Sequence, residues 1–191
     1  MRFFTSDTHF RHKNIIAYDQ RPFESLEEME ESIIAAWNMM VSKNDIVFHL
    51  GDIAFAKPSV AASIIGRLNG KITLIRGNHD IRNGYTFERC AKVSPKMFHD
   101  IADIKIIKIG EKTFVLSHYP YEDPYFGALA PHMFGYWLIH GHSHVGVPRV
   151  IYNYEKKMIN VNCCLWDYHP VPENVILDIV NNPDKYKAAA K

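Results

Sequence analysis

The sequence predicts an α/β (α+β) fold for a chain of 191 residues, with strands in the interior and helices over the outer faces. In the first half, short apolar runs alternate with helical patterns, which indicates parallel strand pairing. Strands dominate the second half, which suggests antiparallel pairing there. No repeat, linker or shift in composition divides the chain, so residues 1–191 are expected to form a single domain.

The helices are predicted from their caps and their apolar periodicity. Ser25 followed by Glu28 is a capping-box pattern, and apolar residues recur at helical spacing after it. Pro58 begins a second helical pattern, which Gly70 follows. The predicted helices cover residues 25–41, 58–68 and, with less regular spacing, 85–90.

The strands are predicted as short runs of apolar and β-branched residues bounded by turn residues. A tight hairpin turn is expected at Gly110-Glu111, and an ordered aromatic loop is expected over residues 119–131. The predicted strands cover residues 2–6, 46–50, 71–76, 103–109, 112–117, 136–140, 158–162 and 175–179.

Composition and charge disfavour several classes of protein. The formal net charge of +1 provides no basic stripe, which disfavours long nucleic acid as a partner. No apolar run approaches the length of about 20 residues that spans a bilayer, and no signal peptide is visible, so no membrane association is expected. The three cysteines do not suggest a disulfide framework, so a reducing compartment, the cytoplasm, is expected. Cys163 and Cys164 are expected in a buried strand, where adjacent residues face opposite sides and cannot chelate as a pair.

The strongest functional signal is a repeated pattern in which an apolar run ends and a side chain suited to metal binding follows. Such a residue lies at the carboxyl edge of a sheet, where open α/β folds bind their ligands. Glycine directly precedes the donor in three of the five instances, and a residue without a Cβ permits a sharp turn close to an ion. The donors are Asp7, His9, Asp52, Asn78, His118, His142 and His144.

These side chains predict a dinuclear metal centre. Oxygen and imidazole donors without thiolate suit Mn, Fe, Zn, Ni or Co, and we favour Mn. Seven side chains are too many for one ion, but they fit two divalent ions if Asp52 bridges them. Two such ions can hold a hydroxide between them and clamp a phosphoryl group, which makes hydrolysis of a phosphate ester the leading hypothesis.

Neighbouring residues are candidates for proton transfer and substrate binding. His79 adjoins Asn78 but is not needed as a ligand, so we expect it to protonate the leaving alkoxide, with Asp80 orienting its ring. Arg76 ends the preceding strand and either contacts phosphate or forms a surface ion pair. Further substrate-binding candidates are Arg11, His12 and Asn14, although His12 and Asn14 fit a solvated loop equally well.

The remaining histidines and aromatic residues have less specific interpretations. His49 and His140 lie within strand runs, which favours a role in the core or behind the metal ligands. Positions at the surface or in loops are expected for His99, His132 and His169. Trp166, Tyr168 and the aromatic residues between 119 and 126 either wall the pocket or pack beneath a long loop.

The motifs resemble those of the metallophosphoesterases, the calcineurin-like phosphoesterase family. They are Asp7-Thr8-His9, Gly51-Asp52, Gly77-Asn78-His79-Asp80, His118 and Gly141-His142-Ser143-His144, in the family's order. The resemblance implies a four-layer αββα sandwich of two mixed β-sheets flanked by helices. It also implies one ion bound by Asp7, His9, Asp52 and His144, a second bound by Asp52, Asn78, His118 and His142, and His79 as the proton donor.

One feature of the family is missing from the second motif. The chain reads Gly51-Asp52-Ile53-Ala54, without the usual arginine, so the cation that contacts phosphate is open among Arg11, Arg76 and Arg82. The short length resembles the compact bacterial and phage members.

The expected function is therefore metal-dependent hydrolysis of a small phosphodiester or phosphomonoester, with nucleotide-derived esters among the candidates. One alternative is a non-catalytic scaffold of the same fold, but such proteins typically lose ligands or the proton donor, and this chain keeps them all. A nuclease is the other alternative, and the near-neutral charge disfavours it.

Overall fold

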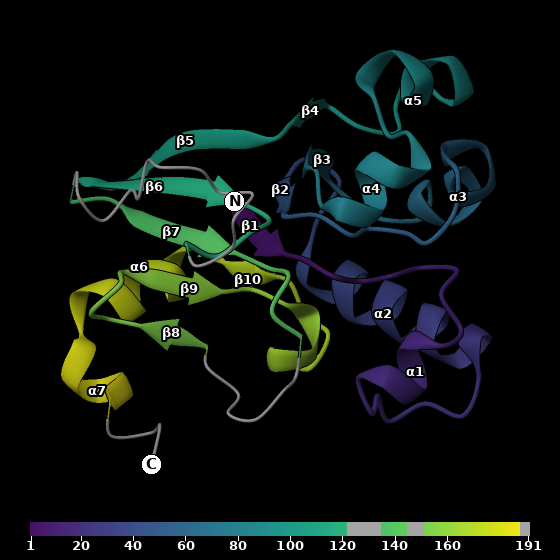
Figure 1. Cartoon of the computed structure of the whole chain (residues 1–191). Coiled ribbons are helices and arrows are strands. Elements are labelled where there is room, and N and C mark those ends of the chain that lie inside the picture. The colour runs from purple at the N-terminus through teal and green to yellow at the C-terminus, as the bar shows by residue number, and fades with distance from the viewer. Residues whose placement is uncertain (122–134, 145–150, 188–191) are drawn as a thin grey trace.

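The structure is a computed structural model that describes residues 1–121, 135–144 and 151–187 (Figure 1). The predictions for His132 and for most of the aromatic loop 119–131 therefore lie outside the described residues. Among the helices of the described part, none has the length and apolar character needed to cross a membrane.

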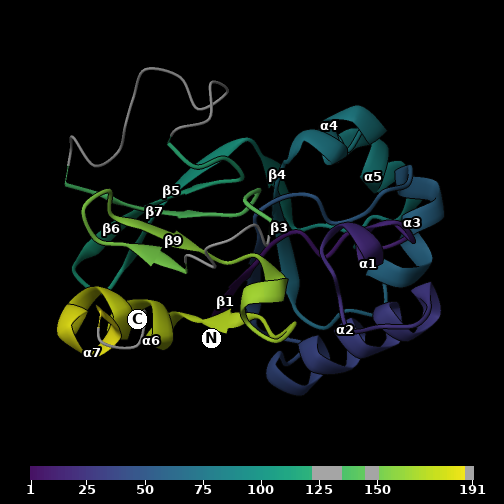
Figure 2. The same cartoon turned by 60° about the horizontal axis from the view of Figure 1, so that its bottom comes forward.

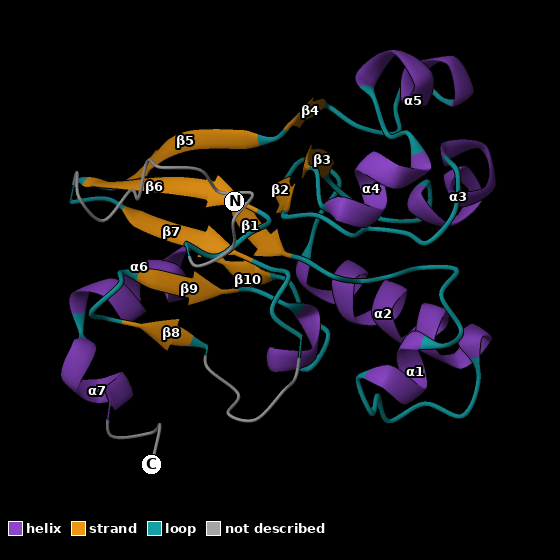
Figure 3. Ribbon diagram, in the orientation of Figure 1, coloured by secondary structure: helices purple, strands orange, loops and turns teal. Residues whose placement is uncertain are grey.

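Two five-stranded mixed sheets form the centre of the molecule (Figure 3). In the first sheet, the order is β10-β1-β2-β3-β4, and every pair except β10 with β1 is parallel. Its strands are β1 (Arg2–Thr5), β2 (Ile46–His49), β3 (Lys71–Ile75), β4 (Asp100–Ala102) and β10 (Val171–Pro172).

The second sheet has the order β5-β6-β7-β9-β8. Ile109 pairs with Lys112 across an antiparallel β5–β6 ladder, which confirms the predicted tight turn at Gly110-Glu111. Its strands are β5 (Ile104–Ile109), β6 (Lys112–Ser117), β7 (Trp137–His140), β8 (Tyr152–Asn153) and β9 (Met158–Asn160).

The helices lie mainly on the far side of the first sheet from the second (Figure 1). The predicted cap of α2 is confirmed, because the Ser25 hydroxyl accepts a hydrogen bond from the Glu28 backbone N–H at 3.1 Å. The helices are α1 (Ile15–Tyr18), α2 (Leu26–Met40), α3 (Pro58–Ile65), α4 (Asn78–Asn83), α5 (Phe87–Val93), α6 (Glu173–Asn181), α7 (Pro183–Lys187) and the 3-10 helix η3 (Cys163–Leu165).

The strands bury two main apolar clusters. Between the sheets, Phe4 and Phe48 of the first sheet share a core with Phe114 and Ile139 of the second. Helix α6 adds Ile176, Ile179 and Val180 to this core, and it lies beneath the sheets in Figure 2. On the other face of the first sheet, a second core is formed with α2 and α3; it includes Phe3, Val47, Ile33, Trp37 and Ile64.

The predicted α/β sandwich of two mixed sheets with helices is thus confirmed.

Some predicted elements were wrong. Residues 175–179 form part of helix α6 and not a strand, because the buried residues Ile176, Ile179 and Val180 recur at helical spacing despite their β-branched side chains. Cys163 and Cys164 are buried as expected, but they lie in η3. Strand pairing in the second half is not purely antiparallel, since β6–β7 and β7–β9 are parallel.

Three short α-helices of the described residues, α1, α4 and α7, were not predicted. Helix α1 interrupts the polar segment after His12, and α4 begins at Asn78, within one of the donor motifs. The predicted helix over residues 85–90 is displaced to Phe87–Val93, where Thr86 caps it through a hydrogen bond from the Arg89 backbone N–H. Short helices of this kind have too few turns to show apolar periodicity in the sequence.

Candidate metal centre

The donor-bearing turns meet where the two sheets adjoin. They follow β1, β2, β3, β6 and β7, so all of them leave the carboxyl ends of parallel strands. Backbone hydrogen bonds join them: Asp7 N–H donates to the Gly51 carbonyl at 2.9 Å, and Gly141 N–H donates to the His118 carbonyl at 3.0 Å. This framework brings together donors that lie as far apart in the chain as residues 7 and 144.

One group of donors is compact enough to hold a metal ion. Asp7, His9, Asp52 and His144 each offer one atom, and these atoms all lie within 4.8 Å of one another. The Nε2 atoms of His9 and His144 are 3.2 Å apart, and His144 Nε2 is 3.7 Å from an Asp7 oxygen. This is the set that the resemblance implies for the first ion.

The donors implied for a second ion lie against the same carboxylate. His118 Nε2 is 3.6 Å from Asp52 Oδ2 and 3.1 Å from His142 Nδ1. The side-chain oxygen of Asn78 is buried without a hydrogen-bond partner, and so is one oxygen of Asp7. Buried polar atoms without partners are costly, and a bound cation would satisfy them.

The backbone is strained at four of the seven donors. Asp7, His9, Asp52 and His142 have φ angles of 57°, 51°, 56° and 64°, in the left-handed region that residues with a Cβ seldom adopt. Such strain tends to gather at functional sites, where the surrounding structure holds the residue in place. Here the strained residues are candidate donors that converge from separate strands.

Two glycines make the close approach of these turns possible. A Cβ at Gly51, whose φ is 91°, would lie 2.4 Å from Nδ1 of His118. A Cβ at Gly77 would lie 2.2 Å from Oδ1 of Asp52 and 2.8 Å from Nε2 of His118. These short distances leave no room for a side chain at either position, which agrees with the predicted role of glycine next to the donors.

The electrostatics of the cluster favour a cation. Burial, reinforced by the charges of Asp7 and Asp80, raises the pKa of Asp52 to about 8. Burial also lowers the pKa of His9 well below its usual value and that of His118 to about 4, so both imidazoles are neutral and able to bind a metal. The Asp52 carboxylate resists ionisation beside these neutral imidazoles, and a bound cation would stabilise its charged form.

His79 lies at the edge of the cluster. Its Nε2 is 3.8 Å from Asp52 Oδ2, and its backbone N–H donates to Asp52 Oδ1 at 2.9 Å. The prediction that Asp80 orients the His79 ring was wrong. The oxygens of Asp80 instead accept hydrogen bonds from the backbone N–H groups of Asp52, Ile53 and Gly77, at 2.7, 3.1 and 2.8 Å. Asp80 thus ties the turn after β2 to the turn after β3.

Two buried residues that sequence reasoning missed support His144. Asp19 Oδ2 lies 2.8 Å from Nδ1 of His144, and the buried Arg21 guanidinium donates to the same oxygen at 3.1 Å. Arg21 also donates to the backbone carbonyls of Asp7 and Thr8. A carboxylate behind a metal-binding imidazole fixes the ring's orientation. Nothing in the local sequence marks Asp19, because its partner lies 125 residues away.

The other histidines fall largely where they were expected. His49 is buried, with Nε2 at 3.0 Å from the Thr8 hydroxyl, and His140 is buried beside Gly141. His99 is exposed, and His169 is half-buried in a loop.

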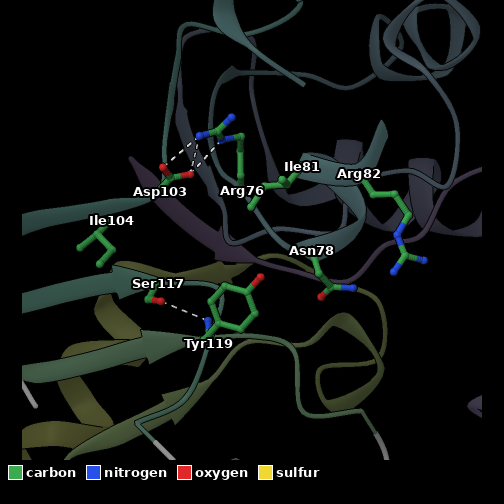
Figure 4. A pocket seen from close by; sticks show the side chains of 8 residues that line it. All are labelled: Arg76, Asn78, Ile81, Arg82, Asp103, Ile104, Ser117 and Tyr119. Atoms are coloured by element: carbon green, nitrogen blue, oxygen red, sulfur yellow. Dashed lines mark hydrogen bonds and ion pairs between the residues drawn. The ribbon is translucent and has the colours of Figure 1, made fainter. Parts of the chain in front are cut away.

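The candidate substrate-binding residues divide into two groups. Arg11, His12 and Asn14 line an open cavity of about 770 Å³ together with His9, His79 and His144. Arg76 lines a second cavity beside Asn78, but its guanidinium is turned to Asp103 (Figure 4), which it contacts at 2.8 and 2.9 Å. Of the two alternatives for Arg76, the structure shows the surface ion pair.

Comparison with known proteins supports a metal-dependent phosphoesterase family for a chain with this site. The fold and the donor cluster define an α/β protein with a candidate metal-binding site at the carboxyl ends of its strands. Residues 2–163 match the family model for the calcineurin-like phosphoesterase superfamily domain, and the chain belongs to this superfamily.

Similar proteins come from archaea, phages and bacteria. An uncharacterised protein of Methanocaldococcus jannaschii is 34% identical over 181 residues, covering 92% of this chain and 88% of its own length. The Gene 66 protein of Mycobacterium phage L5 is 26% identical, with coverage of 94% and 93%. A crystal structure of a protein of unknown function from Aquifex aeolicus has a TM-score of 0.74 at 29% identity, covering 94% of this chain and 98% of that one.

Proposed function

We propose that this protein is a dinuclear metal-dependent phosphoesterase that hydrolyses a small phosphate ester. The observation that carries the proposal is the position of Asp52. Its Oδ2 atom lies 3.8 Å from Nε2 of His9, in the first donor set, and 3.6 Å from Nε2 of His118, in the second. One carboxylate oxygen therefore reaches both sets, as a bridging ligand must.

The residues fit two divalent ions, of which manganese is the first to test. Asp7, His9 and His144 would hold one ion, Asn78, His118 and His142 the other, and Asp52 would hold both. Bound there, two such ions would neutralise the charge on phosphate and lower the pKa of a water molecule between them toward about 7. The unpartnered Asn78 oxygen supports the second site, because a carbonyl oxygen is a suitable ligand for such an ion.

His79 is proposed to protonate the leaving oxygen of the ester. Its ring lies at the cavity beside the donor cluster and is not needed as a ligand. The hydrogen bond from its backbone N–H to Asp52 holds it near the centre, and the rings of His9 and Phe55 contact it edge-on. A proton donor in this place would act on the atom that departs as the ester bond breaks.

The cavity and the charge of the protein support a small substrate. The formal net charge of +1 offers no track for a long polyanion, and the cavity lies directly beside the donors. We propose a phosphodiester or phosphomonoester, with nucleotide-derived compounds as the first class to test. Three buried free cysteines, Cys90, Cys163 and Cys164, support the proposed location in the cytoplasm, a reducing compartment.

A metal titration with chromogenic esters tests this function. Metal-stripped protein is assayed with bis(p-nitrophenyl) phosphate and p-nitrophenyl phosphate in Mn, Ni, Co, Fe or Zn, with Asp52→Asn as the inactive control. We expect turnover that requires metal and that saturates near two ions per chain. Absence of turnover with every metal would favour a non-catalytic scaffold, and faster cleavage of single-stranded DNA at low salt would favour a nuclease.

A further inference from the structure

The cavity of about 770 Å³ beside the donor cluster has an asymmetric lining. His9, His79 and His144 line it on the side of the metal centre. The aromatic side chains of Phe55 and Tyr18 also line it, and so do three cationic side chains, Arg11, Lys13 and Arg82. A ligand whose phosphate reaches the donors would therefore place its remaining atoms among aromatic rings and positive charges.

Among the arginines that line the cavities beside the donors, Arg82 has no carboxylate partner in the part of the chain that the structure describes. The Arg11 guanidinium donates to a carboxylate oxygen of Glu30 at 3.0 Å, and the Arg76 guanidinium forms an ion pair with Asp103. Arg82 is one turn of α4 beyond Asn78 and His79, and it lines both the cavity beside His79 and the cavity beside Asn78. Figure 4 shows its guanidinium near Asn78 with no interaction to any other residue drawn.

An exposed guanidinium in this place suits a phosphate. Arginine presents several N–H donors in a planar fork that matches phosphate oxygens. The second motif of this chain carries no arginine, since Ile53-Ala54-Phe55-Ala56 follows Asp52. Arg82 is thus placed to provide the positive charge that this loop does not supply.

The aromatic part of the lining is exposed. Phe55 is 42% exposed and Tyr18 is 71% exposed. The His12 ring is stacked on Phe55, with centroids 4.2 Å apart and an interplanar angle of 17°. The Tyr18 ring meets the His12 ring edge-on, with centroids 6.1 Å apart. Phe55 is held in place by its backbone N–H, which donates to the Phe10 carbonyl at 2.8 Å. The result is a group of three flat rings that line the cavity.

We propose that this cavity is a nucleotide subsite, in which the base of the substrate packs against Phe55 and Arg82 contacts its phosphate. The inference rests on the proposed phosphoesterase function and names its substrate class. Stacking of a base on an aromatic side chain tolerates any base, because every base has a flat π face. The subsite would therefore select nucleoside esters over esters that lack a ring, with little discrimination among bases.

Two esters that differ only in the base-bearing group test the proposal. The p-nitrophenyl ester of thymidylate and methyl p-nitrophenyl phosphate release the same chromophore, so the ratio of their kcat/KM values isolates the contribution of the nucleoside. Wild type should prefer the thymidylate ester by about 10-fold or more. Phe55→Ala should abolish this preference, whereas Arg82→Gln should lower kcat/KM for both esters by about 10-fold.

Matched controls separate these effects from general damage. Phe87→Ala removes another exposed phenylalanine, 49% exposed, and Arg89→Gln removes another exposed arginine; both side chains lie on α5, outside the lining of this cavity. Both variants should retain wild-type rates and the wild-type preference. Equal rates for the two esters in wild type would overturn the proposal, as would an unchanged preference in Phe55→Ala or unchanged rates in Arg82→Gln.

A binding measurement keeps the subsite testable apart from catalysis. Isothermal titration of the metal-loaded protein compares thymidylate with methyl phosphate, and the proposal expects tighter binding of thymidylate that Phe55→Ala removes. If neither ester is hydrolysed with any metal, the proposed function fails. The titration then tests by itself whether the cavity binds a nucleotide. Equal affinity for the two ligands would refute it.

Discussion

The carboxylate of Asp19 lies 2.8 Å from Nδ1 of His144, so the imidazole presents its other nitrogen, Nε2, to the donor cluster. Burial opposes a charge on this ring, but the hydrogen bond to Asp19 and the charge of Asp7 raise the pKa of His144 to about 9. Without metal, the imidazole therefore holds a proton at neutral pH. A metal ion bound at this cluster would have to displace that proton, and Asp19 would then fix the ring as a ligand.

Replacing Asp19 should weaken metal binding at the site. Asp19→Asn removes the charge that orients His144, and we expect metal affinity to fall by roughly 10- to 100-fold. Isothermal titration with Mn measures this, with Asp103→Asn, the surface partner of Arg76, as the control. Affinity within a factor of two of wild type would show that His144 needs no such support.

Asp52→Asn should abolish turnover and reduce metal content. Its oxygen is the atom shared by the two donor sets, so both sites lose a charged ligand. Metal analysis after dialysis, together with rates on bis(p-nitrophenyl) phosphate, checks this. Near-normal turnover would refute a bridging carboxylate.

His79→Ala should leave metal content unchanged but slow hydrolysis, most strongly for poor leaving groups. An alkoxide needs a proton as it departs, whereas p-nitrophenolate does not. The comparison is between an alkyl ester and a p-nitrophenyl ester of the same phosphate, assayed with the same metal. An equal loss for both esters would exclude His79 as the acid.

Gly77→Ala should destabilise the protein by about 1–3 kcal/mol and impair metal binding, because the added methyl would overlap Asp52 Oδ1 and His118 Nε2. Urea unfolding and Mn titration measure the two effects. Gly66→Ala is the control: its Cβ meets only the Ala62 carbonyl, at 3.0 Å, and it lies outside the donor turns. Similar losses in both variants would indicate a general intolerance of alanine.

Without metal, stability should fall as pH rises. The folded-state pKa of Asp52 is raised from 3.8 to about 8 and that of His144 from 6.5 to about 9, so between pH 6.5 and 9 the folded protein holds protons that the unfolded chain has released. The unfolding free energy should therefore decrease by on the order of 1 kcal/mol per pH unit. Burial lowers the pKa of His118 to about 4, so His118 changes the unfolding free energy with pH only below pH 6.5.

Thermal unfolding in EDTA and in Mn, followed across this pH range, measures the effect. Bound metal displaces the same protons, so the stabilisation by Mn should grow with pH. A midpoint in EDTA that is constant or rises from pH 6.5 to pH 9 would contradict the raised pKa values.

Local sequence was sufficient for the elements with clear caps and periodicity. Ser25 marks the start of α2, and the hairpin at Gly110 joins β5 to β6 as expected. It was insufficient for α6, where β-branched residues that favour strands in isolation form a helix that packs into the inter-sheet core. Tertiary burial outweighed local propensity there, because the helical spacing of Ile176, Ile179 and Val180 buries all three.

The sequence by itself determined the type and order of the candidate donors, since these residues are placed directly after strands. Only the tertiary structure decided how the donors are supported and what surrounds them. Asp80 accepts hydrogen bonds from the backbone amides of Asp52 and Ile53, which lie 28 and 27 residues away, instead of orienting His79, and Asp19 reaches His144 across 125 residues. Hydrogen bonds of this kind join segments that are neighbours only after folding, so no local pattern of residues reports them.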